Sequence, residues 1–156
     1  MYVKYRTTNE NLTSIVLGLD PKPEDFILAI GGSGDQGFAL IGAGEGTRVL
    51  ALDSDKFQVD YMRRNQELIR KGEFKKFLRN RTIESKKKRI RNTLKDHLEF
   101  ERESGTKYFT REKLEEIRNR IENIIIEEGE IFSRAKEGGF SKAYLSNAVT
   151  YPQKLH

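Results

Sequence analysis

The residues with the clearest chemical meaning form a glycine-rich run, Gly-Gly-Ser-Gly-Asp-Gln-Gly at residues 31–37, directly after the apolar segment Phe26–Ile30. Residues 32–37 satisfy the pattern G-x-G-x-x-G. Glycines at this spacing permit a tight turn and a close approach of the backbone to a bound nucleotide. A second apolar segment, residues 48–52, ends at Asp53, whose carboxylate could accept hydrogen bonds from ribose hydroxyls. The pattern leaves open which nucleoside-bearing molecule is bound.

The elements that must position these residues alternate between strand and helix patterns, which indicates an α/β fold. Continuous apolar runs typical of buried strands predict strands at residues 26–30, 48–53, 123–129 and 142–149. Helices are expected at residues 12–19, 37–44, 54–72 and 130–139. Asn11 or Thr13 could cap the first helix and Ser54 the third. This alternation predicts a parallel sheet of about four strands with right-handed crossovers.

The middle of the chain is dense in charge and predicts a helical insert, residues 72–120, within one domain spanning residues 1–156. We expect helices at residues 72–81, 83–105 and 109–123. Thr110 is the expected N-cap of the last of them. The basic run at residues 85–91 is surrounded by acids, and interleaved charges are typical of a solvated helix. This patterning argues against nucleic-acid binding.

An NAD-binding oxidoreductase is the function that the glycine pattern alone suggests, but three features argue against it. The helix after Gly37 is short, about two turns. A helix and a Pro-containing turn precede the first strand, which therefore does not open the domain. A further acid, Glu130, follows the third strand. Together these features look like a class I S-adenosylmethionine-dependent transferase, in which no pyrophosphate needs stabilising by a long helix.

Two segments narrow this resemblance. The segment LALDSDKFQ, residues 50–58, resembles the DxNxxQ element of the S-adenosylmethionine:diacylglycerol 3-amino-3-carboxypropyltransferase family, the betaine-lipid synthesis enzymes. The segment YLSNAVTY, residues 144–151, resembles the LSN…Y element of the same family. The chain departs from the family pattern in the glycine loop, where Gly34-Asp35 replaces Cys-Asn, and it carries Glu130 where Asp is usual. It also stops after the fourth strand, as a short or truncated member would.

The resemblance implies a Rossmann-like class I methyltransferase fold and S-adenosylmethionine as the cofactor. It implies cofactor contacts from Gly31, Gly32, Ser33, Gly34, Asp35, Asp53, Ser54, Gln58, Glu130, Ile131, Ser146 and Asn147. Within this set the glycine loop and Asp35 would meet the amino-acid portion and Asp53 the ribose. Glu130 would meet the adenine, and Ser146 or Asn147 the transferred group. The catalytic residues stay unassigned, and no metal site is expected.

The composition limits the remaining choices. The chain contains no Cys, so a thiol nucleophile or thiolate metal site is excluded. No run approaches the roughly 20 apolar residues of a membrane span, and we expect a cytoplasmic transferase acting on a small-molecule or lipid-like acceptor. The net charge of +5 is mildly basic. A non-catalytic cofactor-binding module and an RNA methyltransferase stay open as alternatives, and an exposed sheet edge could support a homodimer.

Overall fold

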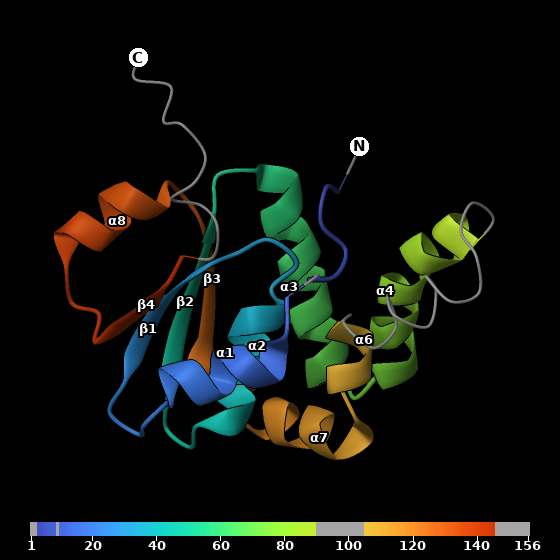
Figure 1. Ribbon diagram of the computed structural model, residues 1–156, viewed down its shortest axis with the longest axis horizontal. Helices are drawn as coiled ribbons and strands as arrows, with labels where there is room; N and C mark the ends of the chain where they lie inside the picture. The colour runs from blue at the N-terminus through green and yellow to red at the C-terminus, as the bar shows by residue number, and fades with distance from the viewer. Residues whose placement is uncertain (1–2, 9, 90–104, 146–156) are drawn as a thin grey trace.

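A four-stranded parallel sheet forms the centre of the computed structural model, which describes residues 3–8, 10–89 and 105–145 (Figure 1). The strands are β1 (Phe26–Ile30), β2 (Arg48–Asp53), β3 (Ile124–Glu128) and β4 (Lys142–Tyr144). They lie in the order β3-β2-β1-β4, and each neighbouring pair is parallel. This order, in which crossovers move outward in both directions from β1, is compatible with a Rossmann-like fold.

Most of the helices cover one face of the sheet. They are α1 (Leu12–Leu19), α2 (Asp35–Ala43), α3 (Lys56–Arg70), α4 (Phe74–Arg89), α6 (Gly105–Tyr108) and α7 (Arg111–Asn119). Because strand side chains alternate between faces, Ile27, Val49 and Ile124 point to this side. They pack with Phe38 of α2 and Met62 of α3 in the larger hydrophobic core.

The opposite face carries a smaller core under a single described helix, α8 (Ile131–Glu137). Leu28, Leu50 and Leu52 are buried there against Ile131. At the β3 edge of this face, Ile125 is 43% exposed. A short 3-10 turn, Ile121–Asn123, leads from α7 into β3. Because all four strands are parallel, their carboxyl ends lie at one edge of the sheet, where the turns after β1, β2 and β3 lie close together.

The structure confirms the predicted parallel sheet, and the caps Asn11 on α1 and Thr110 on α7. The predicted cap of the third helix is wrong, because Asp55 and not Ser54 accepts the N–H of Phe57 (2.9 Å). The break predicted between residues 81 and 83 is also wrong. The described helix α4 continues through it, since neither Gly nor Pro interrupts residues 74–89.

Candidate functional site

The turn between β1 and α2 brings bare backbone to the carboxyl end of the sheet. Gly31 donates its N–H to the carbonyl of Leu52 (2.7 Å), and the N–H of Gly34 closes the turn on the carbonyl of Gly31 (2.7 Å). Gly32 and Gly34 have φ of +51° and +85°, which glycine adopts without a Cβ clash. A Cβ on Gly32 would meet no described atom within 4 Å. A ligand can therefore approach the backbone at this residue.

Two other glycines of the run pack closely against the core. A Cβ on Gly31 would lie 2.6 Å from Cε of Met62 and 2.9 Å from Cβ of Asp53. A Cβ on Gly37 would lie 2.7 Å from Cδ1 of Ile124. Side chains at either position would push α2 or α3 away from the strands. The last glycine of the pattern thus has the helix–strand packing role that its spacing predicts.

Asp53, the last residue of β2, ties the glycine loop to the turn before α3. Its Oδ2 accepts the N–H of Gly32 (2.9 Å) and its Oδ1 accepts the N–H of Asp55 (2.8 Å). Burial raises the pKa of this carboxyl, and the two N–H donors oppose that shift. Each carboxylate oxygen has capacity for more than one hydrogen bond. The half-buried carboxylate is therefore positioned to accept further donors from a ligand.

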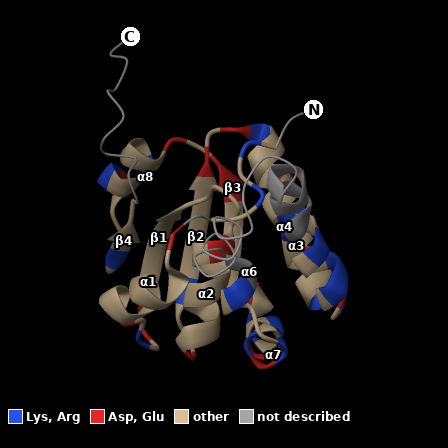
Figure 2. Ribbon diagram, turned by 45° about the vertical axis from the view of Figure 1, so that its right-hand side comes forward, with Lys and Arg blue, Asp and Glu red and all other residues tan. Residues whose placement is uncertain are grey.

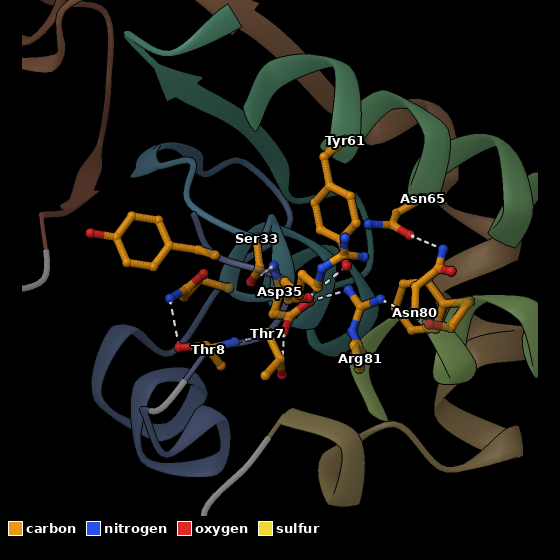
Figure 3. A network of polar contacts seen from close by, with 12 residues as sticks. Thr7, Thr8, Ser33, Asp35, Tyr61, Asn65, Asn80 and Arg81 are labelled. Atoms are coloured by element: carbon orange, nitrogen blue, oxygen red, sulfur yellow. Dashed lines mark hydrogen bonds and ion pairs between the residues drawn. The ribbon is translucent and has the colours of Figure 1, made fainter. Parts of the chain in front are cut away.

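Asp35, the first residue of α2, lies beneath the loop in a buried network (Figure 3). Its carboxylate forms an ion pair with Arg81 of α4, and both side chains are 0% exposed. The same carboxylate accepts the N–H of Thr8 (3.0 Å) and the hydroxyl of Thr7 (3.2 Å). Its backbone N–H donates to the hydroxyl of the buried Ser33 (3.4 Å). Asp35 and Ser33 therefore brace the loop from below.

Arg81 is held on its other sides by aromatic rings and by its own helix. Its guanidinium carbon lies 3.5 Å from the centroid of Phe77 and 5.4 Å from that of Phe109. Nη1 donates to the carbonyl of Phe77 (3.1 Å). These contacts join the charged insert to the glycine loop through Asp35. A guanidinium stacked between rings and paired with a carboxylate keeps its charge inside the core.

Ser54 and Asp55 form the turn from β2 into α3, and Gln58 lies in the first turn of α3. Ser54 is exposed, whereas Asp55 caps the helix. Gln58 is buried, and its amide makes a two-point contact with the backbone of Tyr5, donating to the carbonyl (2.5 Å) and accepting the N–H (3.3 Å). Its described contacts therefore fix the N-terminal segment, residues 3–8.

Glu130 and Ile131 begin α8 at the end of β3. Glu130 is exposed and caps the helix, accepting the N–H groups of Phe132 and Ser133 (both 2.8 Å) and the hydroxyl of Ser133 (2.8 Å). The N–H of Phe132 contributes most to lowering the pKa of Glu130. Ile131 is buried in the smaller core. Adenine contact by Glu130 remains a prediction. Ser146 and Asn147 lie outside the described residues.

The described turns after β1, β2 and β3 are rich in acids, one of which, Asp35, is paired with Arg81. Residues 31–35, 53–55 and 128–130 include Asp35, Asp53, Asp55, Glu128 and Glu130, and they contain neither Lys nor Arg. Figure 2 shows this acidity where β2 and β3 end and α8 begins. A cationic group would gain from such surroundings, and a polyanion would be repelled.

Sequence reasoning missed Arg81 and the N-terminal threonines. Arg81 stands in a charged stretch that reads as a solvated helix face, yet it is fully buried. Its only local signal is Phe77 four residues earlier, a spacing that places a ring and a cation on one helix face. Nothing local connects Thr7 or Thr8 to Asp35, which lies 27 residues from Thr8.

No protein-family model matches this sequence, and comparison with curated proteins and with solved structures finds no match. Within the described residues, no helix is both long and apolar enough to cross a membrane. In the same part of the chain, no three His, Cys, Asp or Glu side chains gather as metal ligands would. We therefore infer the function from the geometry of the sheet edge.

Proposed function

We propose that this chain is a transferase that binds S-adenosylmethionine at the carboxyl edge of its sheet. It would pass a methyl or a 3-amino-3-carboxypropyl group to a small-molecule or lipid-like acceptor. The cofactor supplies a sulfonium, which is already an activated leaving group. The protein then has to orient an acceptor and exclude water.

The observation that carries the proposal is the position of Asp53. Its carboxylate stands at the end of β2, held by the N–H groups of Gly32 and Asp55, with its pKa raised by burial. A partly desolvated carboxylate gains from additional donors, and two adjacent ribose hydroxyls supply them. The open side of Gly32 lies next to it, where the amino-acid portion of the cofactor would approach the backbone.

The charge of the edge favours a sulfonium nucleoside over a dinucleotide. A pyrophosphate at the start of α2 would lie near the carboxylate of Asp53, whereas the charge of the nearby Asp35 is balanced by Arg81. The helix end would attract the pyrophosphate, but the carboxylate of Asp53 opposes that attraction. S-adenosylmethionine instead is a net cation, because its sulfonium and ammonium outweigh its single carboxylate. The short helix α2, nine residues long, fits a ligand that does not depend on a strong helix dipole.

Binding affinity tests this assignment directly. Isothermal titration of the full chain with S-adenosylhomocysteine should give measurable binding, while NAD should give none. Asp53→Asn should weaken binding of S-adenosylhomocysteine by about tenfold or more, because a charge-assisted hydrogen bond is worth about 1.5–3 kcal/mol. Glu45→Gln is the matched control, since Glu45 is an exposed acid in the turn before β2, at the opposite end of the sheet.

Equal affinity of the Asp53→Asn variant and the unsubstituted chain, at unchanged melting temperature, would overturn the assignment. Binding of NAD without binding of S-adenosylhomocysteine would favour the oxidoreductase alternative. The transferred group is read from the product. Methyl transfer releases S-adenosylhomocysteine, and aminocarboxypropyl transfer releases methylthioadenosine. Binding without turnover on any acceptor pool would identify a non-catalytic module.

A further inference from the structure

A groove on the outer side of α3 is not explained by the proposed function. Two adjoining hollows of about 370 and 620 Å³ share Val3, Arg6, Arg64 and Glu67 as walls. The N-terminal segment, residues 3–8, forms one side, α3 forms the base, and Asn80 of α4 closes the smaller hollow. We call the two hollows together the α3 groove. None of the glycine-loop residues lines it.

The wall made by the N-terminal segment is fixed in place by α3 and α2. Gln58 contacts both backbone groups of Tyr5, and the hydroxyl of Tyr61 donates to the carbonyl of Arg6 (2.7 Å). Two residues further, the N–H of Thr8 donates to Asp35 (3.0 Å). Each of these bonds involves a buried side chain. The groove is therefore largely formed before any ligand arrives, which lowers the entropic cost of binding.

Three guanidinium groups line the groove, and one of them, that of Arg63, donates to the carbonyl of Ile126 (3.0 Å). Neither Arg6 nor Arg64 makes an ion pair within the described part of the chain. One acid of the lining, Glu67, already has cationic partners. Its Oε2 is paired with Arg70, and its Oε1 lies 3.6 Å from Nζ of Lys71. The second acid of the lining is the exposed Asp60, at the end nearer the start of α3. The balance of charge along the groove is positive.

The smaller hollow is also lined by a neutral amide, that of Asn80. Asn65 lies between Tyr61 and Asn80 in Figure 3, and its Oδ1 accepts a long hydrogen bond from Nδ2 of Asn80 (3.5 Å). Asn65 itself is buried and lines neither hollow, so its contact fixes Asn80 at the rim. Apolar side chains, Val3 and Leu68, complete the lining.

We propose that the α3 groove binds a small organic anion, with its phosphate or carboxylate against Arg6 and Arg64 and its apolar body against Val3 and Leu68. Guanidinium forks match the planar and tetrahedral oxyanions of both groups. The site is separate from the acidic sheet edge, which we assign to a cationic nucleoside. The inference therefore stands whether or not that edge binds S-adenosylmethionine.

Isothermal titration of the full chain at low ionic strength tests this with three probes: phenyl phosphate, benzoate and neutral benzyl alcohol. Phenyl phosphate, benzoate or both should bind, and benzyl alcohol should not. Comparison of the two anions identifies the preferred headgroup. Arg6→Gln and Arg64→Gln should each weaken anion binding about tenfold, the loss of one charge-assisted hydrogen bond. Arg111→Gln removes the same charge from an exposed position on α7 and should leave the affinity unchanged.

Several outcomes would overturn the proposal. One is the absence of binding heat from either anion, and another is binding of benzyl alcohol as tight as that of the anions. A third is that Arg111→Gln weakens anion binding as much as Arg6→Gln and Arg64→Gln do, which would indicate diffuse electrostatics. Binding of single-stranded RNA but of neither small anion would assign the arginines to a nucleic-acid surface instead. Titration of the Arg6→Gln variant with S-adenosylhomocysteine separates the two sites, since that affinity should not change.

Discussion

Replacing Arg81 with Met should expose the energetic cost of the buried charge beneath the glycine loop. The side chains of Arg81 and Asp35 are both 0% exposed, so neither charge is solvated. Met retains an unbranched side chain to pack against Phe77 and Phe109 but removes the guanidinium. The carboxylate of Asp35 would then be left in the core without its cationic partner.

The size of the effect follows from what remains around Asp35. Removing one partner of a buried ion pair costs about 3–5 kcal/mol. The N–H of Thr8 and the hydroxyl of Thr7 would still donate to the carboxylate, which places the expected loss near the lower limit, about 3 kcal/mol. For a chain of this length, about 2–4 °C of melting temperature corresponds to each kcal/mol, so we expect a fall of about 6–12 °C.

Urea denaturation and thermal melting followed by circular dichroism measure this loss. Lys76→Met is the matched control, because the Lys76–Glu73 pair (2.6 Å) is solvent-exposed and should be worth at most about 1 kcal/mol. Adding Asp35→Asn to Arg81→Met should recover part of the stability, because the amide of Asn leaves no unpaired charge in the core. The two single substitutions should therefore be strongly non-additive.

An equal fall in melting temperature for Arg81→Met and Lys76→Met would contradict a costly buried charge. Additive effects of Asp35→Asn and Arg81→Met would contradict it as well. Either result would mean that the pair contributes little beyond packing, and that the insert is held to the glycine loop by the aromatic contacts alone.

Two further predictions concern Asp25 and Gly31, the residues on either side of β1. A hydrogen bond from Lys142 is the largest of the effects that lower the pKa of Asp25 from 3.8 to about 2. The contribution of the Asp25 carboxylate to the stability of the fold should thus be complete above about pH 4 and lost as the pH falls toward 2. Asp25→Asn should therefore flatten the acid side of a plot of melting temperature against pH. Gly31→Ala should lower the free energy of unfolding in urea by about 1–3 kcal/mol, because its Cβ would lie 2.9 Å from Cβ of Asp53 and 3.0 Å from the carbonyl oxygen of Leu52, neither of which can move aside freely. Gly18→Ala, whose Cβ meets nothing within 4 Å, should instead stabilise by about 0.5 kcal/mol; equal effects of the two would contradict the packing argument.

Local sequence patterns were sufficient for the parts of the fold that depend on neighbouring residues. The apolar runs at 26–30 and 48–53 predicted β1 and β2, since strands buried on both faces need continuous apolar residues. The glycine spacing predicted a tight turn, which the structure shows with positive φ at Gly32 and Gly34, and the end of β2 placed Asp53 beside it. The break predicted between residues 81 and 83 was wrong, because charge patterning does not report where a helix breaks, whereas the helix expected after Thr110 is present.

The sequence by itself thus determined the strands, the glycine turn and the acid at its side, because hydrophobic periodicity and glycine conformation act over a few residues. Only the tertiary structure decided which charges are buried and which line a groove. Arg81 meets Asp35 across 46 residues, and Arg6 faces α3 because Gln58 and Tyr61 hold the N-terminal segment there. Such pairings depend on how helices pack, and packing is set by the whole core rather than by local spacing.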